Sequence, residues 1–248
     1  MADIAGIGVR WTYAFLDRPR EAFDAAAAFW TAVTGSTLSA RRGSTGEFAT
    51  FLPPEGDAFV KLQAVGSGPD VHLDFEIEDV RYAVALAVRL GAEVLADHGH
   101  WAVLASPAGV RFCLVPWHGV TAPPAPTTHP AAGRSRLDQV CLDVGPADHE
   151  RELRFWTDLT GWPLSAATIR PEFSLLRPPQ GLPVQLLVQR LDADRPGGAH
   201  VDLACSDVAA ATAYHVSLGA RILREQPWWT VLSDPAGGTY CLTGRDPT

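Results

Sequence analysis

The stretch "HLDFEIEDV", residues 72–80, returns later in the chain as "HVDLACSDV", residues 200–208. In both copies polar and apolar residues alternate, and an Asp stands near the end of the stretch. A period of two predicts a strand with one buried face, and the Asp is a good N-cap for a helix that follows. The sequence therefore predicts the same unit of strand and helix twice.

Alternation also assigns each side chain of this strand to a face, because residues two apart share a side. Leu73, Phe75 and Ile77 form the apolar face, which we expect to pack under the helix. The polar face carries His72, Asp74 and Glu76 in the first copy and His200 and Asp202 in the second. Two interpretations stay open here, a solvated His–Asp pair on a sheet surface and the lining of a ligand site.

Further segments repeat in the same order and at nearly the same interval, which indicates duplication of a whole unit. The pairs are "FWTAVTG" (29–35) with "FWTDLTG" (155–161), "LGAEVL" (90–95) with "LGARIL" (218–223), and "SPAGVRFCL" (106–114) with "DPAGGTYCL" (234–242). Residues 119–135, rich in Pro and Ala, are predicted to be an extended linker. We therefore expect an N-terminal domain at 7–118 and a C-terminal domain at 136–245.

Each copy is predicted to run βαβββ and then βαβββ, an α+β pattern. Each first helix ends at a glycine, Gly35 or Gly161, which can take the left-handed conformation. Strands are expected at 47–52 and 58–65 and again at 172–177 and 184–191. In the second copy the helix before Gly161 is expected to start at the N-cap Asp148 and to bury Leu153, Phe155, Trp156 and Leu159.

Composition excludes several classes of protein. The 248 residues are 47% hydrophobic and 19% charged, which argues against a disordered chain. The net charge of −8 and the scattered basic residues argue against nucleic-acid binding. A bilayer-spanning apolar run and a signal peptide are not found, so a cytoplasmic protein is expected. The cysteines lack C-x-x-C spacing and are expected to be small buried side chains.

Taken together, the repeated motifs resemble the vicinal oxygen chelate superfamily, which includes glyoxalase I, bleomycin-resistance proteins and extradiol dioxygenases. The likeness rests on the FW…TG helix ends, the two HxD strands, the "LGA" helix stops and the closing hairpins, and it covers nearly the whole chain twice. It implies two tandem domains, each of two βαβββ modules with curled mixed sheets that form a cup and helices outside. It also implies an intramolecular pseudo-dimer, which leaves a monomer or a homodimer open.

Metal-using members of this superfamily place ligands at four cup positions. By this resemblance the positions hold Tyr13, Lys61, His72 and Cys113 in the first copy and Gln139, Leu187 or Gln185, His200 and Cys241 in the second. A catalytic metal usually has about three protein ligands, and among these four positions the histidine is the one usual ligand retained. The sequence therefore predicts no cofactor. A divalent metal is the less favoured alternative, with His200 and Gln139 as its better ligands.

We therefore expect binding of a small aromatic or hydrophobic molecule in a cup without a catalytic metal. The resemblance alone places this activity in antibiotic resistance or secondary metabolism. Further expected ligand contacts are Trp11, Trp101 and Arg111 in the first copy and Trp228 and Trp229 in the second, since aromatic side chains stack on flat ligands.

Two enzymatic alternatives remain beside the binding protein. In a metal-independent lyase or isomerase, His72 with Asp74, or His200 with Asp202, would act as the general base, because a carboxylate fixes the tautomer of its histidine. The second alternative is a metal-dependent glyoxalase or dioxygenase.

Overall fold

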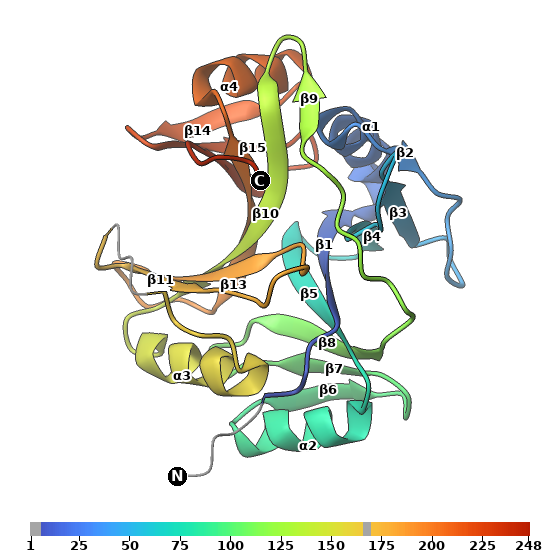
Figure 1. Cartoon of the computed structure of the whole chain (residues 1–248), viewed down its shortest axis with the longest axis vertical. Helices are drawn as coiled ribbons and strands as arrows, with labels where there is room; N and C mark the ends of the chain where they lie inside the picture. The colour runs from blue at the N-terminus through green and yellow to red at the C-terminus, as the bar shows by residue number, and fades with distance from the viewer. Residues whose placement is uncertain (1–5, 166–169) are drawn as a thin grey trace. The chain divides into compact units, whose positions relative to one another are not determined.

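The computed structural model describes residues 6–165 and 170–248, and the elements follow the order of the two repeats (Figure 1). The first repeat comprises β1 (Trp11–Pro19), the short 3-10 helix η1 (Arg20–Ala22), α1 (Phe23–Thr34), β2 (Thr37–Leu38), β3 (Phe48–Leu52), β4 (Val60–Val65), β5 (Asp70–Ile77), α2 (Val80–Arg89), β6 (Glu93–Asp97), β7 (Ala102–Ala105) and β8 (Arg111–Pro116). The second repeat comprises β10 (Gly133–Val144), α3 (His149–Thr160), β11 (Phe173–Leu176), β12 (Gln185–Arg190), β13 (Gly198–Cys205), α4 (Val208–Ser217), β14 (Arg221–Glu225), β15 (Trp229–Ser233) and β16 (Thr239–Thr243).

Hydrogen bonding joins the strands of each repeat into one mixed sheet. The order is β2-β3-β4-β1-β5-β8-β7-β6 in the first and β11-β12-β10-β13-β16-β15-β14 in the second. The pairs β1–β4, β5–β8 and β13–β16 are parallel, whereas the hairpin strands are antiparallel. The predicted α+β fold of two tandem halves, each with a mixed sheet, is thereby confirmed.

The compact units of the structure do not follow the repeats. The first unit combines residues up to 13 with 72–121 and 140–199, and the second combines 14–71, 122–139 and 200–248. Each unit therefore takes one βαβββ module from each repeat. The boundaries 7–118 and 136–245 describe the repeats along the sequence and stay a prediction.

The helix ends confirm part of the local prediction. Gly35 and Gly161 have φ of 61° and 69°, the left-handed conformation that ends α1 and α3. Asp79 and Asp207 cap α2 and α4, because their carboxylates accept from the backbone N–H three residues on. Asp148 occupies the N-cap position of α3, but its side chain makes no capping hydrogen bond.

In the first unit, the apolar face of β5 packs as alternation predicts, with Leu73, Phe75 and Ile77 all buried. The rings of Phe75 and Trp156 have centroids 5.8 Å apart. One expectation for α3 was wrong, because Leu153 is only half-buried and Glu152 is completely buried instead. Glu152 tolerates burial because it accepts from Trp156 Nε1 at 2.7 Å and from the Ala108 N–H at 2.9 Å.

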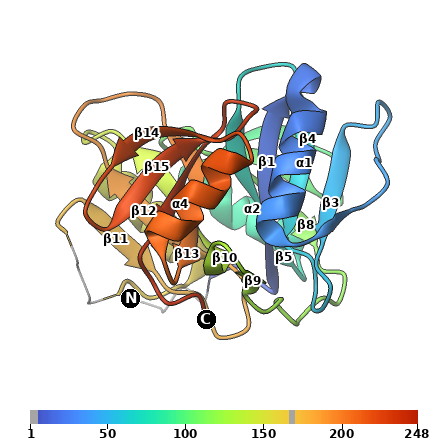
Figure 2. The ribbon, with the colours of Figure 1, turned by 90° about the horizontal axis from the view of Figure 1, so that it is seen from above.

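In the second unit, α1 and α4 run side by side, as Figure 2 shows. Phe29 of α1 meets His215 of α4 edge-on, with ring centroids 5.7 Å apart. His215 Nδ1 lies 2.9 Å from the Tyr240 hydroxyl. Burial lowers the pKa of His215 to about 4, so this histidine is a neutral member of the core at neutral pH.

The predicted linker is more ordered than an extended connection. Within it β9 (Thr127–His129) pairs antiparallel with the first residues of β10. Asp57 and Ala122 exchange two hydrogen bonds, from each N–H to an oxygen of the other residue. In the described part of the chain, no helix is long and apolar enough to cross a bilayer.

Candidate functional site

The polar face of β5 brings a histidine and a carboxylate together in the first unit. His72 Nε2 lies 3.6 Å from Asp74 Oδ1, and each side chain is only 11% exposed. The strand alternation that buries Leu73 and Phe75 turns these two side chains to the other face. The pair is therefore largely enclosed by protein, which argues against a fully solvated surface pair.

The neighbouring strand adds a sulfur donor. Strands β5 and β8 are parallel, and their register sets Cys113 opposite Asp74. Ligand atoms of His72, Asp74 and Cys113 all lie within 4.8 Å of one another. This set of three residues, here named the HDC cluster, combines imidazole nitrogen, carboxylate oxygen and sulfur, which are the three ligand types of protein zinc sites.

The polar row of β5 continues to a third ionisable residue. Glu76 is 1% exposed, and its Oε1 lies 2.8 Å from Nδ1 of His118, which is exposed. His118 follows the end of β8, so this pair also joins the two strands that carry the HDC cluster. One face of β5 thus carries, at every second residue, a histidine and two carboxylates.

The second unit holds the matching residues of the second repeat. His200 Nε2 lies 3.3 Å from Asp202 Oδ1, and Gln139 Nε2 donates a short hydrogen bond to Asp202 Oδ2. Cys241 stands in register with Asp202, as Cys113 does with Asp74. Gln139 holds the second carboxylate by an amide, which orients it without adding charge.

A further carboxylate lies one residue away from Gln139. Burial raises the pKa of Asp138, and the bidentate Arg245 acts against this rise with two contacts of 2.7 Å. The nearby charge of Asp202 also raises the pKa of Asp138. Asp138 and Asp202 therefore interact electrostatically, and Arg245 supplies the counter-charge for Asp138.

The four cysteines are free and buried, as expected from their spacing. Burial raises the pKa of the Cys205 thiol to about 12, so this residue is inert at neutral pH. Cys113 differs from it because it lies beside a histidine and an acid.

The remaining predicted contact residues are distributed unevenly. Trp11, Tyr13, Gln139 and Cys241 are buried, Lys61, Trp101, Gln185 and Trp229 are half-buried, and Arg111 is exposed. Lys61 Nζ lies 5.1 Å from the ring centroid of Phe15, and Trp101 stacks on His98 at 3.9 Å. Trp228 is 70% exposed, so its ring meets solvent. Their contact with a ligand stays a prediction.

Asp74 was not among the candidate metal ligands expected from the sequence. The four positions of the resemblance do not include it, and it was assigned only to orient His72. The sequence signal for its place was the spacing of two residues from His72. The parallel register of β5 and β8 then brings Cys113 to the same place. With Asp74 counted, the cluster offers three candidate ligand atoms, the number of protein ligands in a catalytic zinc site.

With this geometry established, the sequence itself decides the family. A glyoxalase-like domain model matches residues 14–115 and again residues 139–243. The chain belongs to the glyoxalase-like family. Both matches lie within the tandem repeats, so the family assignment and the duplication support each other.

Solved structures with a similar fold include a triple mutant of 4-hydroxymandelate synthase from Streptomyces coelicolor, with a TM-score of 0.63, 16% identity, and coverage of 98% of this chain and 94% of that one. The Mn(II)-bound glyoxalase from Novosphingobium aromaticivorans has a TM-score of 0.62 and 16% identity, over 97% of this chain and 82% of that one. The 2,2',3-trihydroxybiphenyl 1,2-dioxygenase from Sphingomonas wittichii has a TM-score of 0.61 and 16% identity, over 97% and 90%. At these identities the likeness concerns the fold.

A search among curated proteins finds none that matches the sequence. The function of this glyoxalase-like protein therefore has to be argued from its own residues.

Proposed function

We propose that this glyoxalase-like protein transforms a small molecule at the polar face of β5 and β8, where the HDC cluster holds a divalent ion. The observation that carries the proposal is the set of three ligand atoms within 4.8 Å. Ligands of a tetrahedral ion lie between three and four ångströms apart when metal–ligand distances are about 2.0–2.3 Å. The 3.6 Å contact between His72 and Asp74 fits that requirement.

The donor types favour zinc over a hard ion. Magnesium and calcium prefer all-oxygen sites, whereas Zn²⁺ accepts a mixture of nitrogen, oxygen and sulfur. When bound, the ion would polarise a substrate oxygen as a Lewis acid. The protein's share is to hold three ligands on two paired strands and to keep most of the solvent away from them.

The class of substrate is proposed from the fold relatives. One of them is the 2,2',3-trihydroxybiphenyl 1,2-dioxygenase, and a further solved structure of similar fold is that of a halotolerant catechol dioxygenase. Two neighbouring oxygens can chelate one ion, which suits a site with three protein ligands and open positions. We therefore propose a small aromatic compound with two adjacent oxygens, for which catechol serves as the probe.

The His–Asp contact, present in both repeats, supports a second candidate function. The distances are 3.6 Å at His72–Asp74 and 3.3 Å at His200–Asp202. A carboxylate beside an imidazole fixes its tautomer and stabilises the imidazolium, so either histidine can act as a general base without a metal. This is lyase or isomerase chemistry in which the histidine moves a proton.

Metal analysis tests the first proposal. Protein purified without chelators is assayed for bound zinc, iron, manganese and nickel, together with His72→Ala, Asp74→Asn and Cys113→Ser. We expect the wild type to carry an equivalent of metal that each variant loses. His98→Ala and Cys205→Ala are the matched controls, since they change a histidine and a cysteine outside the cluster.

A binding and turnover assay with catechol separates the remaining alternatives. Metal-free protein that converts a substrate, and loses this with His72→Ala or His200→Ala, would support the proton-transfer function instead. Saturable tryptophan quenching without metal and without product would leave a binding protein, and both enzymatic proposals would then be wrong.

A further inference from the structure

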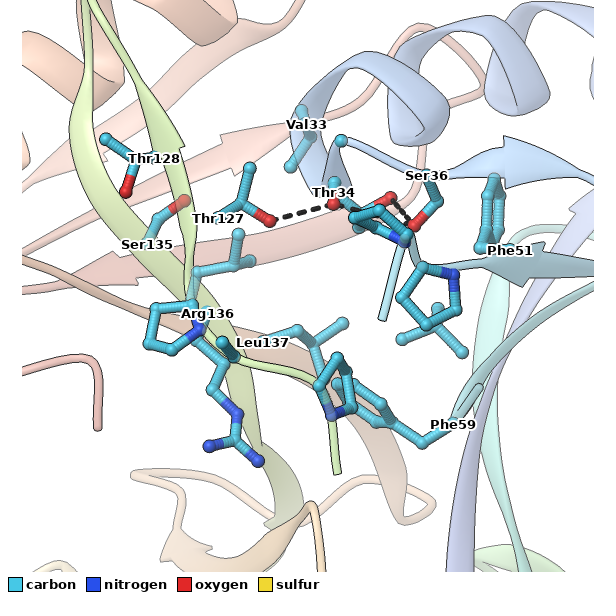
Figure 3. Close-up of a pocket in the computed structure, with 18 of the residues that line it drawn as sticks. Val33, Thr34, Ser36, Phe51, Phe59, Thr127, Thr128, Ser135, Arg136 and Leu137 are labelled. Carbon is cyan, nitrogen blue, oxygen red and sulfur yellow. Dashed lines mark hydrogen bonds between the residues drawn. The ribbon is translucent and has the colours of Figure 1, made fainter. Parts of the chain in front are cut away.

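A cavity of about 390 Å³ lies in the second unit, and neither His200 nor Asp202 lines it (Figure 3). Strand parity shows this separation. Phe51 and Val60 line the cavity, whereas their chain neighbours Thr50 and Lys61, which pair with each other, point to the opposite face. On β13 the cavity is lined by Leu203. The side chain of its chain neighbour Asp202 lies on the other face. On β3, β4 and β13 the cavity is therefore on the helix side.

The segment predicted to be a linker, residues 119–135, covers this cavity. Residues 124–128 line it, and the chain is held on both sides of that stretch. Before it, Asp57 and Ala122 exchange their two hydrogen bonds. Within it, Thr127 Oγ1 donates to the Thr34 carbonyl at 2.8 Å, as the dashed line in Figure 3 shows. Because residues 124–128 are held at both places, this segment covers the cavity without filling it.

The space has the character of a ligand site. A volume of 390 Å³ lies in the range of about 300–1,000 Å³ that small-molecule sites occupy. Val33, Phe51, Phe59 and Leu203 give it apolar walls. Small-molecule sites combine such walls with a few placed polar groups, and two of these stand on β10.

The two polar groups are Ser135 and Arg136. Ser135 lines the cavity and is 8% exposed, and no described residue hydrogen-bonds to its hydroxyl. Arg136 Nε is buried and has no hydrogen-bond partner among the described residues, while Nη1 donates to the main-chain oxygen of Thr248. A buried donor without an acceptor is costly, so a bound acceptor would stabilise it.

The charges around the cavity favour an acidic ligand in one orientation. Asp138, the carboxylate nearest in sequence to Arg136, is bound by both Nη atoms of Arg245. Glu55 also lines the cavity, as do Val33 and Thr34 at the C-terminus of α1, a helix end of negative character. Figure 3 shows Arg136 at the opposite end of the lining from Ser36, which follows α1. An anionic head would therefore lie at Arg136 and not at α1.

We propose that this cavity is a second ligand site, separate from the HDC cluster, that binds a small amphiphilic carboxylic acid. Its carboxylate accepts from Arg136 Nε, and its apolar body packs on Val33, Phe51 and Phe59. The end of α1 repels an acid bound the other way round. The site depends on no metal and on no histidine.

The test uses the full chain with methyl-labelled Val and Leu, and decanoate as the probe with decan-1-ol as its uncharged match. We expect saturable shifts of the Val33, Val60 and Leu203 methyl signals on titration with decanoate. The alcohol should bind roughly tenfold more weakly, because a hydrogen bond to a charged group is worth about 1.5–3 kcal/mol. Equal binding of acid and alcohol, or shifts that avoid these methyl groups, would overturn the proposal.

Substitutions locate the charged contact. Arg136→Leu should weaken decanoate binding roughly tenfold and change decan-1-ol binding little, and Arg136→Lys should restore part of the loss. Arg134→Leu, two residues earlier on the same strand and outside the cavity lining, is the matched control. Val33→Ala, which removes part of the apolar wall, tests the site independently if Arg136→Leu does not fold, and it should weaken decanoate and decan-1-ol alike. A control variant with the same effect as Arg136→Leu would contradict the site.

Discussion

Arg18 Nε donates to Asp234 Oδ2 at 2.7 Å, and neither side chain is exposed to solvent. The same carboxylate oxygen accepts from Trp30 Nε1 at 2.9 Å, and Oδ1 accepts from the N–H groups of Ala236 and Gly238. The carboxylate thus has four donors, which is how a buried charge can be tolerated. Within the second unit, this pair fixes the Asp-Pro-Ala-Gly turn before β16 to β1.

Breaking the Arg18–Asp234 pair from one side should be strongly destabilising. Arg18→Met leaves the buried carboxylate without its counter-charge, and we expect a loss of about 3–5 kcal/mol in the free energy of unfolding. Urea denaturation followed by circular dichroism measures it. Asp234→Asn added to Arg18→Met should recover part of the loss, whereas Glu78→Gln at the exposed Arg10–Glu78 pair should change little. A loss no greater than that of Glu78→Gln would show that the pair does not stabilise the fold.

Glu152 plays the corresponding part in the first unit. Burial raises the pKa of its carboxyl, and the Trp156 and Ala108 N–H groups both depend on it as an acceptor. Glu152→Ala should lower stability by about 2–5 kcal/mol, because two buried donors lose their partner. Glu152→Gln keeps one acceptor oxygen and should lose less. Equal losses for both variants in thermal unfolding would mean that packing and not hydrogen bonding dominates.

The N-caps give a graded prediction on three helices. Asp79→Ala and Asp207→Ala each remove a 2.9 Å capping bond and should cost about 1 kcal/mol. Asp148→Ala removes an acid from the same position of α3, where no capping bond exists, and should cost less. Chemical denaturation of the three variants side by side checks this order.

His215 should make stability depend on pH. Its folded pKa of about 4 lies below the ordinary value of 6.5, so the unfolded chain takes up a proton first as the pH falls. The neutral, buried state is therefore fully favoured above pH 6.5, and up to about 3 kcal/mol is lost between pH 6.5 and 4. The loss should level off below pH 4.

His215→Gln isolates this contribution from the other acids and histidines. The difference in unfolding free energy between wild type and variant should shrink as the pH falls from 6.5 to 4. A difference that stays constant over that interval would show that His215 keeps its ordinary pKa in the fold.

The repeat and the strand faces were predictable because both depend on short-range pattern. Period-two alternation placed His72 and Asp74 opposite Leu73 and Phe75, and the glycines at 35 and 161 ended their helices as predicted. These features follow from backbone geometry within a few residues. Burial of the cysteines followed from their type and spacing.

Contacts between distant residues were not predictable in the same way. Arg18 and Asp234 form a hydrogen bond although they are 216 positions apart in the sequence, and no local sequence pattern pairs them. Glu152 is polar and was not among the residues expected to be buried, yet it is buried because its carboxylate oxygens accept from the Trp156 and Ala108 N–H groups. The register that brings Cys113 to Asp74 depends on how β5 and β8 align, which composition does not determine. The same holds for the cavity under residues 124–128.

Cobalt substitution tests the HDC cluster most directly. Metal-free protein titrated with Co²⁺ should develop a sulfur-to-cobalt charge-transfer band in the near ultraviolet, because Cys113 supplies a thiolate to the ion. Cys113→Ser should abolish the band at equal Co²⁺, His72→Ala and Asp74→Asn should weaken binding, and Cys205→Ala should leave the spectrum unchanged. A wild-type titration with no such band, or a band that persists in Cys113→Ser, would contradict a metal site built from His72, Asp74 and Cys113.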